Sequence, residues 1–359
     1  MAGWREPWGK LELKGDAVYW EGEGELLKLE PWGENALRFR ASKRLEIPDE
    51  DWTLLPPGKH RALVEREDER IVIRNGKIGA EVLINGTVNY FDAKGEYILE
   101  EYWIDKREER VPHRRAREYR HHSSDSFRTS LYFKANPQER FYGMGQVPNG
   151  CFDLKGTVIE LQQKNGHCVI PFLLSSENYG FLWNNPAVGQ AELVHNHTRW
   201  YAEATRGIDY VVTAGDSPDE LLQNYTGLTG RPPMLPDFAS GFWQCKLRYR
   251  SQEELLEVAR EYRRRGLPLS VIVIDYFQWT EQGAWRFAGE VVECLIAERF
   301  SQLFEAFKPI GQRIDAVHIQ GDEVVAVFVE KLAHDARGVG PLGAGVRQAI
   351  ALQHHALVV

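Results

Sequence analysis

The chain has 359 residues, of which 43% are hydrophobic and 27% charged, and its formal net charge is −8. This composition is typical of a soluble globular protein of one or two domains, and the negative charge argues against nucleic-acid binding. The basic run from Lys106 to His122 also contains Glu residues, so we interpret it as a solvated loop or an edge strand.

The first ten residues, MAGWREPWGK, lack the apolar segment of a signal peptide, and no window approaches the length of a membrane span. The four cysteines, at positions 151, 168, 245 and 294, show neither the spacing of a zinc site nor that of a disulfide framework. We therefore expect a reduced, cytoplasmic protein that does not bind a membrane.

Up to about residue 235, short alternating or apolar runs are separated by Gly, Asn-Gly and Asp turns. Examples are KLELKG at 10–15, RIVIRNG at 70–76 and IDYVVTAG at 208–215. Many short strands at this spacing predict a β-sandwich with a solvated outer face. Residues 217–230, SPDELLQNYTGLTG, begin with Ser and acids and carry apolar residues on one side, which predicts a helix.

The proline-rich stretch RPPMLPDF, residues 231–238, predicts a semi-rigid connector, and we place a domain boundary after residue 235. FASGFWQC follows as a short strand. SQEELLEVAREYRRRG is then a helix, with Ser251 as its N-cap, Glu254 as the capping-box partner and Gly266 as its stop.

The helix leads to VIVIDYFQWTEQGAW, residues 271–285, which starts as a buried strand and continues into an acid and a group of aromatics. Strand, helix and strand with short links form a parallel βαβ unit. In parallel sheets the chemistry lies at the carboxyl ends of the strands, and Asp275 occupies this position.

Several motifs in order resemble glycoside hydrolase family 31, the family of retaining α-glucosidases and α-xylosidases. They are YGMGQ, FDLKG, IPFLLSS, GFLWNNPAVG, GRPPMLPDFASGFWQCKLRY and LPLSVIVIDYFQWTEQGAW, and the resemblance covers roughly residues 10 to 287. It implies a galactose-mutarotase-like β-sandwich over 1–235, followed over 236–287 by the first strands of a (β/α)8 barrel.

The resemblance also implies a sugar site without metal or cofactor. In the family, the acid that matches Asp275 hydrogen-bonds sugar hydroxyls. The matching substrate-binding candidates are Asp275, Tyr276, Phe277, Trp279, Arg248, Tyr249 and Asn165, with Asp153 beside Asn165 in segments that resemble a loop over the pocket. Aromatic rings pack on the apolar faces of pyranoses, and carboxylates accept hydrogen bonds from their hydroxyls.

We find no candidates in the sequence for the two catalytic carboxylates that a retaining glycosidase requires. After Asp275 there is no strand carrying the family's Lys-x-Asp nucleophile motif, and a complete barrel takes about 200 residues or more. We assign no catalytic residue and expect a truncated form without glycosidase activity. The alternative is a non-catalytic carbohydrate-binding or interaction protein built on the sandwich.

Composition changes after Phe287: residues 288–359 contain no Trp, Tyr, Thr, Asn or Met. We favour an out-of-frame tail over a fused module, although an apolar helical stripe from Val292 to Phe307 and a predicted hairpin around Gly321-Asp322 support the module. His195 and His197 have the spacing of one strand face, and without a third ligand we expect no metal there. An α-linked oligosaccharide or glycoside is the expected partner, and the intact parent could form a homo-oligomer.

Overall fold

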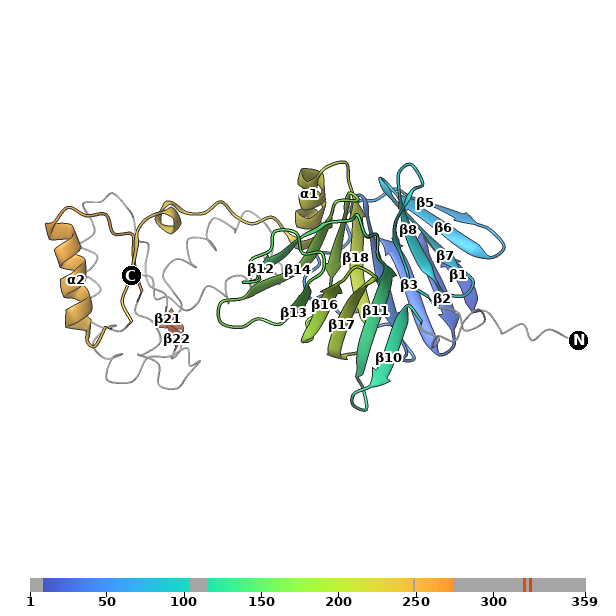
Figure 1. Cartoon of the computed structure of the whole chain (residues 1–359), viewed down its shortest axis with the longest axis horizontal. Helices are drawn as coiled ribbons and strands as arrows, with labels where there is room; N and C mark the ends of the chain where they lie inside the picture. The colour runs from blue at the N-terminus through green and yellow to red at the C-terminus, as the bar shows by residue number, and fades with distance from the viewer. Residues whose placement is uncertain (1–8, 104–114, 248, 274–318, 321–322, 325–359) are drawn as a thin grey trace, which may run out of the picture. The chain divides into compact units, whose positions relative to one another are not determined.

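The computed structural model describes residues 9–103, 115–247, 249–273, 319–320 and 323–324. The chain divides after Arg231 into two compact units, residues 1–231 and 232–359, and each is described by itself. Figure 1 shows the strands of the first unit arranged in layers, with the β-rich fold that the alternating runs predict.

One layer of the first unit is an eight-stranded antiparallel sheet with the order β1-β2-β3-β4-β18-β15-β14-β12. Strands β1 to β4 pair with their neighbours in sequence. Strand β4 also pairs with β18, although the two strands lie far apart along the chain. The strands are β1 (Lys10–Lys14), β2 (Ala17–Gly22), β3 (Glu25–Pro31), β4 (Ala36–Ser42), β12 (Phe141–Gln146), β14 (Cys168–Ser175), β15 (Tyr179–Trp183) and β18 (Ile208–Ala214).

Two five-stranded sheets form the opposing layer, with the orders β5-β6-β7-β8-β9 and β10-β11-β17-β16-β13. A bridge between Glu101 and Phe133 joins them. Their strands are β5 (Ala62–Arg66), β6 (Arg70–Asn75), β7 (Ile78–Leu83), β8 (Val88–Asp92), β9 (Tyr97–Glu100), β10 (Arg117–His121), β11 (Phe127–Lys134), β13 (Val158–Leu161), β16 (Gly189–Leu193) and β17 (His197–Thr205). Within the basic run, Arg117–His121 forms the edge strand β10, and residues 106–114 lie outside the described residues.

The main core lies between the layers and contains buried residues from all three sheets. Strand β3 shows the alternation that this packing requires, because Leu27 and Leu29 are buried while the residues between them are partly exposed. The predicted sandwich is therefore confirmed.

The solvated outer face that the strand pattern predicts is wrong for the centre of the eight-stranded sheet. Helix α1 (Pro218–Thr229) and the segment after β4 cover it, and a second apolar cluster forms there with Leu54 and Leu228. Adjacent residues of β18, Val211 and Val212, belong to different clusters, so both faces of this strand are buried. Local alternation cannot reveal a covering contributed by distant segments.

The predicted helix over 217–230 is confirmed, with Ser217 as N-cap and Gly230 as C-cap. The Ser217 hydroxyl accepts a hydrogen bond from the Glu220 backbone N–H at 3.3 Å. None of the helices in the described part of the chain is long and apolar enough to cross a membrane.

The second unit contains the predicted strand–helix–strand order. A short 3-10 helix, η1 (Asp237–Ser240), precedes β19 (Trp243–Cys245), α2 (Gln252–Arg264) and β20 (Val271–Val273). Strands β19 and β20 pair in parallel, which confirms the βαβ unit. Strands β21 (Ile319–Gln320) and β22 (Glu323–Val324) pair as the predicted hairpin, whereas the predicted stripe from Val292 to Phe307 lies outside the described residues.

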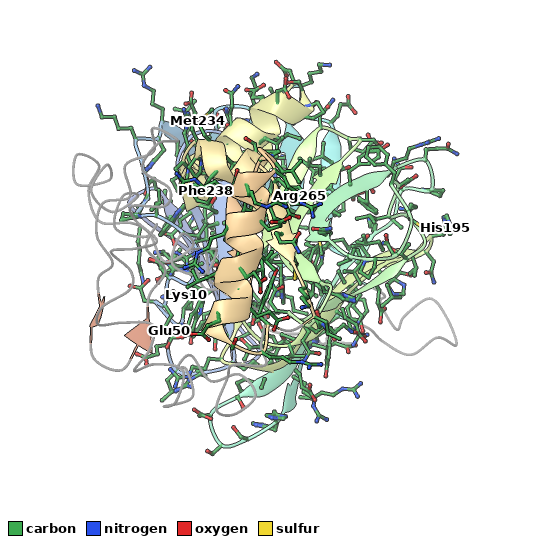
Figure 2. All side chains as sticks on the ribbon, turned by 90° about the vertical axis from the view of Figure 1, so that its left-hand side faces the viewer. Lys10, Glu50, His195, Met234, Phe238 and Arg265 are labelled. Atoms are coloured by element: carbon green, nitrogen blue, oxygen red, sulfur yellow. The ribbon has the colours of Figure 1, made fainter. Side chains whose placement is uncertain are left out.

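Helix α2 ends as its sequence predicts. The N–H of Leu267 donates to the Tyr262 carbonyl and the N–H of Gly266 donates to that of Arg263, both at 3.0 Å, while Gly266 has a φ of 65°. This is a Schellman motif, in which a left-handed glycine satisfies the last carbonyls of a helix. Arg265, the C-cap residue, is labelled in Figure 2.

Candidate functional site

The carboxyl edge of the β19–β20 pair is the site that the sequence singles out. Trp243, Gln244 and Cys245 align in parallel with Val271, Ile272 and Val273. Cys245 and Val273, the last residues of the two strands, therefore lie at the same edge of the pair. Asp275 is the second residue after Val273 along the chain and lies outside the described residues.

The two faces of this strand pair differ. Gln244 and its partner Ile272 lie on the face covered by helix α2, where the Tyr262 hydroxyl donates to Gln244 Oε1 at 2.5 Å. Ile272 packs in an apolar cluster with Leu255 and Ala259 of the helix. Because side chains alternate along a strand, Cys245 and Val273 project from the opposite face.

The loop between β19 and α2 is anchored by Glu254 of the first helical turn. Its carboxylate pairs with Lys246 and accepts the Arg250 backbone N–H at 2.7 Å. The Lys246 hydrogen bond, followed by that of Arg250, lowers the pKa of Glu254 below its usual range. The N-cap Ser251 accepts the Glu254 N–H at 3.2 Å as predicted, but the reciprocal capping-box bond to the Ser251 N–H is replaced by the bond to Arg250.

The sequence did not predict the interactions of Glu254 with Lys246 and with the Arg250 backbone. Its partner Lys246 lies eight residues earlier, outside any helical or strand period, so only the fold of the loop brings the two charges together. The pairing determines the path of the loop that carries the candidates Arg248 and Tyr249.

Tyr249 is buried, with 9% of its surface exposed. Its ring belongs to the apolar cluster under α2, and its hydroxyl accepts a hydrogen bond from Gln244 Nε2 at 3.4 Å. The ammonium of Lys246 lies 5.6 Å from the ring centroid. In this arrangement Tyr249 packs against the helix and supports the loop.

The remaining barrel candidates lie outside the described residues. They are Arg248, Asp275, Tyr276, Phe277 and Trp279. Among residues 232–247 and 249–273, neither strand of the parallel pair carries a carboxylate.

The sandwich candidates Asn165 and Asp153 occupy separate turns. Asn165 is exposed, in the turn closed by the bridge between Lys164 and His167. The Asp153 carboxylate accepts the backbone N–H groups of Lys155 at 3.0 Å and Phe141 at 3.2 Å. These two bonds, that of Lys155 foremost, lower the pKa of Asp153 and give it a turn-stabilising role.

The two histidines of the HNH sequence do not share a strand face. His197 is the first residue of β17, whereas His195 lies exposed in the turn before it, as Figure 2 shows. His197 Nε2 is 3.5 Å from a Glu192 carboxylate oxygen, and its ring contacts Tyr132 edge-on. The residues that the structure describes hold no cluster of three or more potential metal ligands.

Two family models match the chain. The glycosyl hydrolase 31 N-terminal galactose mutarotase-like domain matches residues 26–191, and the glycosyl hydrolases family 31 TIM-barrel domain matches residues 232–334. The barrel match includes residues 288–334, part of the stretch that the sequence analysis separates as a tail. That separation stays a prediction.

Two curated proteins of this family are similar to the chain in sequence. An uncharacterized family 31 glucosidase, ORF2, of Pseudescherichia vulneris is 42% identical over 285 residues, which are 76% of this chain and 54% of that protein. An alpha-xylosidase of Saccharolobus solfataricus is 41% identical over 160 residues, 42% of this chain and 22% of that enzyme. This chain thus spans about half the length of the first relative and less of the second.

The crystal structure of a GH31 alpha-xylosidase from a soil metagenome, complexed with xylose, superposes with a TM-score of 0.73 at 36% identity. The alignment covers 88% of this chain and 52% of that one. The two domain models lie in the order that the fold requires, sandwich before barrel, and the structural match includes most of the chain. The chain belongs to glycoside hydrolase family 31.

Proposed function

We propose that the protein recognises terminal α-xylosides or α-glucosides, and that the intact enzyme of this type hydrolyses them with retention of configuration. The observation that carries the proposal is the parallel pairing of β19 and β20, as a barrel requires of its first strands, with Asp275 two residues after β20 along the chain. The relatives described as alpha-xylosidases and as a family 31 glucosidase support the substrate class.

The chemistry of this segment suits a sugar. Asp275 and three aromatic residues follow β20 closely along the chain. The carboxylate can accept hydrogen bonds from neighbouring hydroxyls, while Tyr276, Phe277 and Trp279 supply aromatic surface for the pyranose ring.

Hydrolysis with retention requires a nucleophilic carboxylate and an acid/base carboxylate about 5 Å apart. The sequence after Asp275 contains no Lys-x-Asp motif. We therefore infer that this chain alone binds the sugar without cleaving the glycosidic bond.

The test uses the full chain, an Asp275→Asn variant, and Glu257→Gln on the exposed face of α2 as a control of equal charge change. Calorimetry with xylose- and glucose-terminated oligosaccharides measures binding, and aryl α-xylosides and α-glucosides report turnover. Losing charge-assisted hydrogen bonds to hydroxyls should weaken binding about ten- to a hundredfold in Asp275→Asn only.

Each result has a clear meaning. Turnover by the pure chain that disappears in Asp275→Asn would contradict the inactive assignment. Binding that is equal in the wild type and in Asp275→Asn would exclude the Asp275 site and favour the rival function, a non-catalytic carbohydrate-binding protein built on the sandwich.

A further inference from the structure

A hollow of about 320 Å³ lies on the sandwich unit, beside the segment that follows β4. We call residues 43–61, which connect β4 to β5, the strap. Ile47, Pro48, Glu50 and Trp52 of the strap form one wall, and residues 184–186 and 204–207 form the others. No candidate residue of the proposed Asp275 site lines this hollow.

The walls are held by a buried arginine. Arg38 is fully buried and donates to both carboxylate oxygens of Asp209, at 3.1 and 2.6 Å, and to Asp51 of the strap at 2.6 Å. Asn184 joins the same group: its amide donates to Asp209 at 2.8 Å and accepts the Thr53 hydroxyl hydrogen at 2.8 Å. The hollow is therefore formed before a ligand arrives, which reduces the entropic cost of binding.

The lining combines an aromatic platform with exposed hydrogen-bonding groups. Trp52 is 44% exposed, and its indole N–H has no hydrogen-bond partner among the described residues. The half-exposed side chains of Arg206 and Glu50 pair at 2.9 Å in the same lining. An indole face beside such a pair offers stacking for the apolar face of a sugar, with donors and acceptors for its hydroxyls.

A second hollow, of about 410 Å³, meets the first at Arg40 and Ile47, which line both. Of its two aromatic residues Trp20 is buried, and Tyr19 is partly exposed, with the ammonium groups of Lys14 and Lys28 4.9 and 5.8 Å from its ring centroid. Lys10 of the second hollow and Glu50 of the first are labelled in Figure 2. Two connected hollows, each with its own aromatic residue, suit a chain of several sugars better than a single one.

The charges around both hollows nearly cancel. The first hollow is lined by two bases, Arg40 and Arg206, and two acids, Glu50 and Asp209, and the acids and bases of the second are almost equal in number. This balance disfavours a highly charged ligand. Arg40, which borders both hollows, is only 4% exposed, and its guanidinium pairs with Glu30 and Asp49 at 2.5 Å each, so it adds no free positive charge to the lining.

We propose that these two hollows form a surface site for a neutral polysaccharide chain, separate from the Asp275 site. Trp52 is its stacking residue, and Tyr19, Arg206 and Glu50 contact the hydroxyls. Such a site holds the polymer on the sandwich and raises the local concentration of its chain ends near the protein.

The experiment is native affinity electrophoresis of the full chain in gels that contain soluble xyloglucan or dextran. The variants are Trp52→Ala, Tyr19→Ala, Arg206→Gln and Asp275→Asn. Tyr97→Ala is the control, because Tyr97 is 52% exposed on β9, a strand of another sheet that lines neither hollow.

At least one polymer should retard the wild type, Asp275→Asn and Tyr97→Ala. Trp52→Ala and Tyr19→Ala should each weaken binding about tenfold, corresponding to about 1.4 kcal/mol. Arg206→Gln removes a half-exposed guanidinium and leaves the aromatic residues in place. It therefore tests the site even if Trp52→Ala disturbs the strap. Circular dichroism of each variant verifies its fold.

Retardation that Asp275→Asn abolishes and Trp52→Ala leaves unchanged would assign the polymer to the Asp275 site and overturn the proposal. No retardation of the wild type by either polymer would also overturn it. The polymer site is tested by whether Asp275→Asn is still retarded. The test therefore stays interpretable if the proposed function of Asp275 is wrong.

Discussion

Arg117 offers the sharpest test of how the sandwich is held together. It lies buried on β10 and donates to Glu25 of β3 at 2.8 Å, to Glu101 after β9 at 2.6 Å, and to the Gly86 carbonyl at 2.8 Å. One guanidinium thus links the eight-stranded sheet with both five-stranded sheets. Two buried carboxylates share this single positive charge.

Replacing Arg117 with Met should destabilise the protein by about 3–5 kcal/mol, because it leaves Glu25 and Glu101 buried without their counter-charge. Arg120→Met is the matched control: Arg120 lies on the same strand but is exposed, so its loss should cost less than about 1 kcal/mol. Urea unfolding of the full chain, followed by fluorescence, measures both differences.

The loss should depend on pH in a defined direction. Burial raises the pKa of Glu101 above its usual range, while Arg117 acts in the opposite direction. Without Arg117 this pKa rises further. A carboxyl group with a raised pKa in the folded state stabilises that state below its unfolded pKa, about 4.3, and loses this contribution as pH rises through the folded value.

The deficit of Arg117→Met should therefore be larger at about pH 7 than at about pH 5, where Glu101 takes up a proton more readily. An unfolding free energy within about 1 kcal/mol of the Arg120→Met value at both pH values would refute the reasoning. It would mean that the buried carboxylates find other compensation once the guanidinium is absent.

Two further substitutions test other parts of the sandwich. Gly145→Ala should destabilise the protein by about 1–3 kcal/mol in the same urea assay. Gly145 has a φ of 80° at a bulge of β12, and a Cβ there would lie 2.2 Å from the Cys168 carbonyl oxygen. Gly150→Ala is the control for the left-handed backbone alone, because a Cβ at Gly150 has open space around it. Arg38→Lys should keep the charge but lose the two-pronged contact with Asp209, so limited proteolysis should cut the strap faster than in the wild type, and an unchanged cleavage rate would show that the strap is held by its apolar contacts.

Helix α2 and its neighbours show how far local sequence determines this fold. A serine N-cap, apolar residues at helical spacing and a terminal glycine specified the helix, and the structure has it from Gln252 to Arg264. The hairpin over 319–324 likewise follows from its two-residue turn sequence. These features can be predicted because the interactions that create them join residues only a few positions apart.

The family was also accessible from the sequence. Motifs from both domains identify the same family, and the order of strand, helix and strand places Asp275 after a strand of a parallel pair. The roles of Asp275 and of the other sugar-site candidates stay predictions. For Tyr249, the local pattern placed the residue after the first strand without revealing that the ring packs under α2.

Only the tertiary structure decided which surfaces are covered and which charges meet. The alternating strands predict one wet face, but Leu54 and Leu228 cover the centre of the eight-stranded sheet. Arg38 meets Asp209, 171 residues away, and Arg117 meets Glu25, 92 residues away. Such contacts arise when sheets stack, and no local period records them. The sequence by itself therefore determined the elements and the family, whereas the buried ion pairs and the two hollows exist only because distant strands pack together.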